Sequence, residues 1–136
     1  MLNTIYLNLV AILTYIKFFF YNLLIGEYTI ILYRNFLERI PENSVVLDIG
    51  VGNCYSLLKN KQILIEKKIK IVGVDIDSDS INLAKKIIRY NDMDNYIQVY
   101  CQDIFTFDNS QKFDFIYFSN SYSVIPEINK MMTFTY

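Results

Sequence analysis

The sequence predicts an α/β protein with a doubly wound, mostly parallel sheet of about four strands, preceded by a hydrophobic helix. Two observations carry this prediction: apolar strand-like segments alternate with helical patterns, and a glycine turn follows the first strand. The expected strands are 45–49, 71–75, 97–101 and 113–118, and the expected helices are 55–68 and 79–90. Right-handed crossovers between such strands bring their carboxyl ends to one edge of the sheet, where ligands bind.

The chain begins with a long apolar segment. Residues 5–25 form a run of about 20, enough to cross a bilayer, although Asn8, Lys17 and Asn22 oppose insertion. One helical stripe carries Ile5, Leu9, Ile12, Ile16, Phe19 and Leu23. A transmembrane anchor, a helix lying on a membrane and a helix packed on protein all remain open. We expect two units, a hydrophobic helix at 1–26 and a ligand-binding domain at 27–136.

A second helical pattern covers 27–40 and leads through the turn at 41–44 into the first strand. That strand, Val45–Ile49, contains Asp48 and ends at Gly50 and Gly52, whose lack of Cβ atoms allows positive φ and close approach to a ligand. A dinucleotide site would place a third glycine at Tyr55. Asp48 repels phosphate and attracts a cation, which favours S-adenosylmethionine with its ammonium and sulfonium groups.

These residues resemble motif I, [D/E]-x-G-x-G-x-G, of the class I (Rossmann-like) S-adenosylmethionine-dependent methyltransferases, with Cys54 in place of the last glycine. The resemblance covers about 28–126. It implies that Asp48 binds the methionine ammonium, and that the helix at 27–40 covers the cofactor. Tyr28 or Tyr33 would then approach the sulfonium through a cation–π contact or pack in the core.

The second strand ends in Asp75, Ile76 and Asp77. An acid about 20 residues beyond a glycine loop binds ribose hydroxyls in doubly wound folds, and Asp75 has this spacing. Ile76 would then pack against the adenine. For Asp77 we expect a helix cap instead.

The third strand leads to Asp103 and Ile104. In the methyltransferases that this chain resembles, an acid at this position contacts the adenine amino group, and Ile104 would offer backbone and apolar contact. The alternative is an aspartate that hydrogen-bonds within its own turn.

The fourth strand ends in small polar residues. The resemblance implies that this loop lies beside the transferred methyl group, with Ser119 at the cofactor and Asn120, Ser121 and Tyr122 as candidate catalytic residues. A polar loop without a catalytic role is the alternative. The Asn/Asp-Pro-Pro-Tyr signature of some amino-methylating enzymes is absent from the sequence.

Composition restricts the partners and cofactors. With 13 basic and 14 acidic residues, the net charge of −1 gives no electrostatic case for nucleic acid. Without histidine, Cys54 and Cys101 do not have the spacing of a zinc site, so we expect no metal. A basic cluster is expected to be solvated: Lys59, Lys61, Lys67, Lys68 and Lys70.

The sequence therefore predicts a methyltransferase that uses S-adenosylmethionine and acts on an unknown small-molecule or protein acceptor. Methyltransferases of this type have seven strands, so we expect a C-terminally truncated domain whose open sheet edge is available to a covering partner. The rivals are a non-catalytic remnant of the fold or a membrane-interaction protein, and a dinucleotide-dependent oxidoreductase. We expect the chain to be membrane-associated with its domain in the cytoplasm, or else soluble in the cytoplasm.

Overall fold

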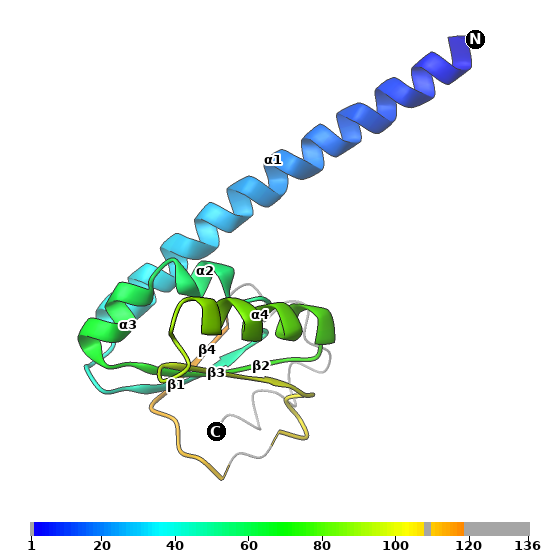
Figure 1. The fold of residues 1–136 in the computed structure, drawn as a ribbon. Coiled ribbons are helices and arrows are strands. Elements are labelled where there is room, and N and C mark those ends of the chain that lie inside the picture. The colour runs from blue at the N-terminus through cyan, green and yellow to red at the C-terminus, as the bar shows by residue number, and fades with distance from the viewer. Residues whose placement is uncertain (1, 108–109, 119–136) are drawn as a thin grey trace.

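The computed structural model describes residues 2–107 and 110–118 (Figure 1). Helices and strands alternate after a long first helix, as the sequence predicts. Their order along the chain is α1 (Leu2–Arg39), β1 (Val45–Ile49), α2 (Tyr55–Leu58), α3 (Lys61–Lys67), β2 (Lys70–Asp75), α4 (Ser78–Tyr90), β3 (Ile97–Cys101) and β4 (Phe115–Tyr117).

The four strands form one sheet in the order β3-β2-β1-β4, and every pair is parallel. The chain runs from β1 outward through β2 to β3 and then crosses back to place β4 on the other side of β1. In open α/β sheets, this reversal beside the first strand marks where ligands bind. The predicted parallel α/β fold is confirmed, and the carboxyl end of β1 lies at the point of reversal.

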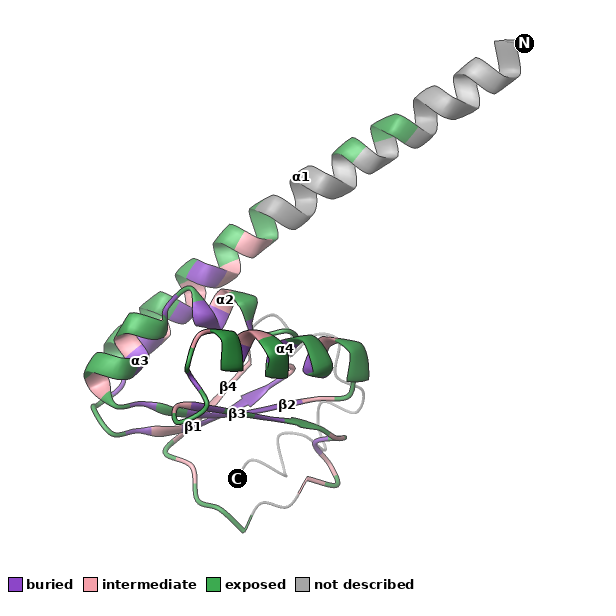
Figure 2. Cartoon of the chain, in the orientation of Figure 1, coloured by how far each residue is buried: buried purple, intermediate pink, exposed green. Residues whose placement is uncertain are grey.

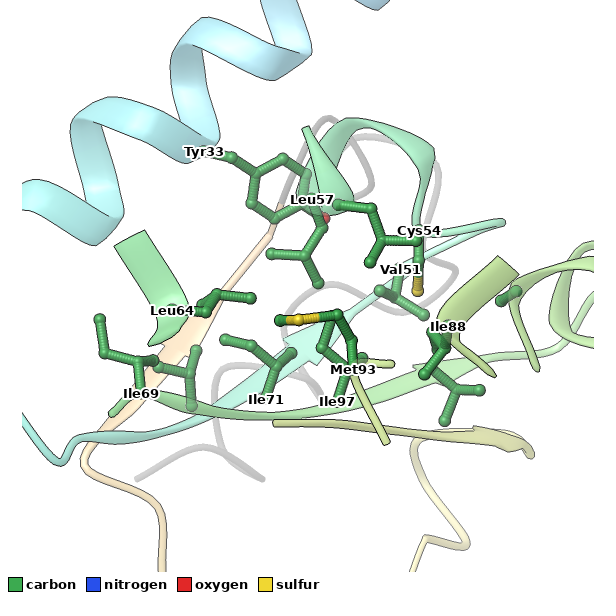
Figure 3. Packing of buried hydrophobic residues seen from close by; sticks show 14 of the residues in the cluster. Tyr33, Val51, Cys54, Leu57, Leu64, Ile69, Ile71, Ile88, Met93 and Ile97 are labelled. Atoms are coloured by element: carbon green, nitrogen blue, oxygen red, sulfur yellow. The ribbon is translucent and has the colours of Figure 1, made fainter. Parts of the chain in front are cut away.

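Both faces of the sheet are covered within the described residues. The helices α1 to α4 all lie on one face (Figure 1), where their apolar side chains pack on Val46 and Ile71 (Figure 3). On the other face, Leu47 and Val72 pack with Ile104 and with phenylalanines of the connection from β3 to β4. Side chains alternate between the faces along a strand. Asp48 therefore lies on the face that the helices cover.

The first helix is continuous, whereas the sequence suggested separate helical segments at 5–25 and 27–40. It passes through Gly26 without a break, because one glycine in a helix costs only about 1 kcal/mol relative to alanine. Its C-terminal half is buried on the domain through Ile30, Tyr33 and Leu37. The N-terminal half extends away from the domain (Figure 1), whereas the buried positions of α1 lie where it packs on the domain (Figure 2). Ile12, in the N-terminal half, is 54% exposed.

The prediction of a transmembrane anchor at 5–25 finds no support. Over 2–107 and 110–118, no helix combines the length and the apolar character that crossing a membrane requires. Asn8, Lys17 and Asn22 interrupt the apolar run of α1, as the sequence already indicated.

The predicted helix at 55–68 is divided in two by Asn60. This side chain is buried and donates hydrogen bonds to the carbonyl oxygens of Ile30 in α1, at 3.0 Å, and of Ser56 in α2, at 3.1 Å. A buried amide needs such partners. The break between α2 and α3 therefore lets Asn60 join this segment to α1.

The basic cluster was predicted to be solvated, and for Lys67 this prediction is wrong. Its Nζ donates to the carbonyl oxygens of Leu37 and Glu38, both at 2.9 Å, and to that of Ile40. The last carbonyls of a helix have no partner within the helix, and a cation there also interacts favourably with the helix dipole. Lys67 thus closes the C-terminus of α1 from α3.

Candidate functional site

The loop that follows β1 adopts a left-handed backbone at three positions. Gly50 has φ 74°, Gly52 has φ 59° and Cys54 has φ 62°. The amide of Gly50 donates to the carbonyl oxygen of Val74 at 2.8 Å, which holds the start of the loop against β2. Cys54 takes the conformation that glycine would adopt more easily. Its side chain is buried in the core, and burial raises the pKa of its thiol.

Gly73 in β2 is a residue of the site that the sequence analysis missed. A Cβ atom at this position would lie 2.7 Å from Cγ1 of Val51, so the loop packs directly on the bare backbone of β2. The available signal was a glycine in the middle of a buried, β-branched strand, which often marks close approach of another backbone.

Asp48 ends up in a fully enclosed position. Its side chain is 1% exposed, and Oδ2 accepts a hydrogen bond of 2.7 Å from the hydroxyl of Tyr33. Oδ1 is buried and has no hydrogen-bond partner among the described residues. Burial raises the pKa of Asp48 to about 7, the negative charge of Asp75 also raises it, and the bond from Tyr33 lowers it. A buried carboxylate with one unpaired oxygen favours a cation as its next partner.

Tyr33 comes from α1 and joins that helix to the site. It is 3% exposed, and its ring lies 5.0 Å from that of Tyr117 in β4 at a tilt of 44°. Burial raises the pKa of Tyr33, and the nearby Asp48 raises it further. Sequence analysis named this side chain for a cation–π contact or for core packing, and no sequence signal linked it to a carboxylate 15 residues away.

A cavity of about 270 Å³ lies over the glycine loop. Residues 50–57 form most of its wall, and Thr29 and Tyr33 of α1 and Ser80 of α4 complete it. This volume is slightly below the range of about 300–1,000 Å³ that is usual for small-molecule sites. Elements far apart in the sequence thus meet at the loop that the sequence singled out.

Asp75 fastens the glycine loop to the end of β2. Its Oδ2 accepts from the amide of Gly52 at 2.8 Å, and its Oδ1 accepts from the amide of Asp77 at 3.0 Å. A carboxylate oxygen has two acceptor sites, so each can still accept a hydroxyl. Ile76, next in the chain, is 74% exposed.

Asp77 caps α4, as the sequence predicts. It accepts from the amides of Asp79 and Ser80 and, at 2.5 Å, from the Ser80 hydroxyl. The hydroxyl bond from Ser80 is the largest cause that lowers the pKa of Asp77.

Asp103 and Ile104, two of the three residues predicted to contact the adenine, have their side chains in different surroundings. Asp103 is exposed, and its Oδ1 accepts from the amide of Phe105 at 2.9 Å, which is the local turn considered as its alternative role. It lies two residues beyond Cys101, the register partner of Asp75, and therefore at the same end of the sheet. Ile104 is buried on the opposite face of the sheet from α1.

The structure thus brings Asp48, Gly50, Gly52 and Asp75 together and leaves the side chain of Ile104 elsewhere. The remaining predicted residues lie outside the described part of the chain: Ser119, Asn120, Ser121 and Tyr122.

Comparison with known proteins gives matches to methyltransferases. A family model described as a methyltransferase domain matches residues 40–134. The protein-lysine N-methyltransferase EFM4 of Saccharomyces cerevisiae is 39% identical over 70 residues, which are 52% of this chain and 30% of that protein.

Solved structures show the same fold. A SAM-dependent methyltransferase from Aquifex aeolicus aligns with a TM-score of 0.63 at 21% identity over 76% of this chain and 55% of its own. PKMT2 from Rickettsia typhi, solved in complex with AdoHcy, aligns with a TM-score of 0.56 at 30% identity over 65% of this chain and 17% of its own. The chain therefore spans about a third of the length of the curated relative and about half of the first of these structures.

Proposed function

We propose, because this chain belongs to the methyltransferase domain family, that it binds S-adenosylmethionine over the loop after β1 and transfers the methyl group of that cofactor. One observation carries the proposal. Asp48 is buried near the end of β1, its Oδ1 has no hydrogen-bond partner among the described residues, and Tyr33, which donates to its Oδ2, lines the cavity over the glycine loop. An ammonium group, directly or through one water, would supply the missing partner.

Different residues of this chain would bind different parts of the cofactor. Asp48 would hold the ammonium, and Gly50 and Gly52 would let the backbone approach the methionine portion. Asp75 would accept hydrogen bonds from the ribose hydroxyls while it keeps its bond to the Gly52 amide. Asp103 would accept from the adenine amino group.

Two apolar contacts complete this assignment. The exposed side chain of Ile76 is available to cover the adenine. Ile104, whose side chain is buried on the other face, would contribute through its backbone only. Ser119 would complete the contacts to the cofactor from the loop after β4.

S-adenosylmethionine, when bound, supplies a methyl group on a cationic sulfur that is a good leaving group. In the proposed transfer, the acceptor's lone pair would form the new bond to the methyl carbon as the sulfur–carbon bond breaks, and S-adenosylhomocysteine would be the product. Such a transfer depends mainly on positioning. We propose Asn120, Ser121 and Tyr122 as the residues that orient the acceptor.

A protein lysine is the acceptor that we favour. Support comes from the EFM4 relative, whose name describes a protein-lysine N-methyltransferase. A lysine ammonium must lose a proton before its nitrogen can attack, so this acceptor would need a general base or a high pH.

Isothermal titration of the full chain tests the cofactor. We expect S-adenosylmethionine and S-adenosylhomocysteine to bind, NADH not to bind, and Asp48→Asn to weaken binding at least tenfold, since a charge-assisted bond contributes about 1.5–3 kcal/mol. Asp79→Asn, an exposed acid on α4, is the matched control and should bind normally.

Asp75→Ala is a less suitable variant, because it also removes the partner of the Gly52 amide. Absence of binding by the folded wild-type chain would overturn the proposed function. Preferential binding of NADH would support the oxidoreductase instead. Transfer of labelled methyl to a lysine-containing protein, lost when its lysines are replaced by arginine, tests the acceptor.

A further inference from the structure

Tyr33 is held rigidly between α1 and the sheet. Its ring packs on Tyr117 of β4 at 5.0 Å, and Tyr117 in turn stacks on Phe36 of α1 at 4.3 Å. Figure 3 shows the Tyr33 ring extending from α1 beside Leu57 toward the buried cluster. Its hydroxyl donates to Asp48 Oδ2 at 2.7 Å, the ordinary length of an O–H···O hydrogen bond, and both groups are buried. The phenol therefore has little freedom to leave the carboxylate while α1 remains packed on the sheet.

The other groups around Asp48 offer its charge no compensation. Cys54 faces it from the start of α2, Asp75 from the end of β2, and Tyr117 lies beside Tyr33 in β4. Cys54 and Tyr117 are neutral thiol and phenol groups, and Asp75 is an acid. The Tyr33 hydroxyl stabilises the ionised carboxylate and occupies only Oδ2, and Oδ1 has no hydrogen-bond partner within 2–107 and 110–118.

We propose that Tyr33 is a positioning residue for cofactor binding: its hydroxyl holds Asp48 so that Oδ1 is presented to the ammonium group, and α1 must be packed on the sheet for the ligand to bind tightly. This inference rests on the proposed function. It adds a residue of α1, outside the glycine loop, that acts on the ligand through Asp48.

The proposal predicts a pH dependence of ligand affinity that a purely structural role for Tyr33 would not produce. An ammonium ligand requires ionised Asp48, so affinity should rise as the pH passes through the Asp48 pKa of about 7. The Tyr33 bond lowers that pKa. Without it the pKa is higher, and the rise in affinity should begin at a higher pH.

The experiment is a titration of S-adenosylhomocysteine into the full chain between pH 6 and 8.5. For Tyr33→Phe we expect a midpoint about one pH unit higher than for wild type and about fivefold weaker binding at pH 7, with the difference narrowing at pH 8.5. Tyr90→Phe removes a hydroxyl from an exposed position at the end of α4 and should follow the wild-type curve.

A variant with 3-fluorotyrosine at position 33 tests the proposal in the other direction. It retains the hydroxyl that bonds to Asp48, which keeps the test available if Tyr33→Phe fails to fold. Its more acidic hydroxyl is a stronger donor, so the midpoint should move to lower pH. An unchanged midpoint in a folded Tyr33 variant would overturn the positioning role, whereas failure of the wild type to bind at any pH would overturn the proposed function.

Discussion

At the residue scale, Asp48 lowers the stability of the fold and at the same time provides a binding group for a cation. A carboxylate that is 1% exposed, with one oxygen that has no partner in the described part of the chain, loses hydration without full compensation, and its pKa rises to about 7 for this reason. The same unpaired oxygen is what a cationic ligand needs. A residue that lowers stability and provides binding is common at functional sites, where the two requirements conflict.

The effect of Asp48 on stability depends on pH in a definite direction. In the folded chain its pKa is about 7, and in the unfolded chain it is near the ordinary 3.8. Between these values the folded state holds the proton more strongly, so the free energy of unfolding should fall as pH rises from about 4 to 7 and then level off. Over pH 5–7 the expected loss is about 2 kcal/mol, measured by urea denaturation at each pH.

Asp48→Asn serves as the reference for this measurement, because an amide does not titrate. The difference in unfolding free energy between the variant and the wild type should change in favour of the variant as the pH rises. A difference that stays constant between pH 5 and 8 would contradict the raised pKa of Asp48.

At the element scale, the glycine loop depends on its contact with β2. Val51 lies where a side chain at position 73 would lie, Gly50 donates to Val74, and Asp75 accepts from Gly52. The loop is thus fixed at three successive points along one strand. This arrangement explains how Cys54 can be kept at φ 62°, since strained backbone persists where its surroundings determine it.

Gly73→Ala should displace this loop. A Cβ atom 2.7 Å from Val51 requires the loop or the strand to move, which we expect to cost about 1–3 kcal/mol of unfolding free energy and to weaken S-adenosylhomocysteine binding. Urea denaturation and calorimetric titration measure the two effects. Adding Val51→Ala to the variant should restore part of the stability, because it removes the overlapping atoms.

Gly26→Ala is the matched control for the glycine substitution. A Cβ atom there would meet nothing within 4 Å in the described structure, and the position is helical. We expect this variant to gain about 0.5–1 kcal/mol from helix propensity and to bind normally. Equal effects of the two substitutions would show that contact with Val51 is not the cause.

At the scale of the whole molecule, local patterns in the sequence predicted much of the fold. The apolar runs located β1, β2 and β3 within a residue, and the alternation of helix and strand implied the parallel order that the sheet has. Asp48, Gly50, Gly52 and Asp75 were identified because each follows or ends a strand. Such signals are local in the sequence. Because crossovers between parallel strands are right-handed, these residues are expected to lie at one common edge of the sheet.

Features that depend on distant contacts were not predictable in this way. Asn60 divides one predicted helix because its partner is Ile30, and Lys67 closes a helix that ends near residue 39. The hydrogen bond from Tyr33 to Asp48 joins α1 to β1, and the sequence pattern of neither element indicates it. In each case a polar group finds its partner only after the helices have packed.

Ligand binding should change the dynamics of α1 through Tyr33. We expect S-adenosylhomocysteine to slow amide hydrogen exchange over residues 30–39 in the wild type, because the ligand stabilises the ionised Asp48 that Tyr33 contacts. In Tyr33→Phe, at a ligand concentration that gives the same occupancy as in the wild type, the ligand should slow amide hydrogen exchange in this segment less. Equal protection in both proteins would contradict the link, and exchange in β2 and β3 provides the internal reference.

The long, uninterrupted α1 has a thermodynamic consequence. Its N-terminal half and the half that bonds to Asp48 belong to one helix, so any interaction of the N-terminal half that favours or opposes packing of the other half must change the affinity at Asp48. Linkage makes the effect reciprocal: the factor by which such an interaction changes ligand affinity equals the factor by which the ligand changes that interaction. Through this helix, interactions at its N-terminal end would be thermodynamically coupled to ligand binding at Asp48.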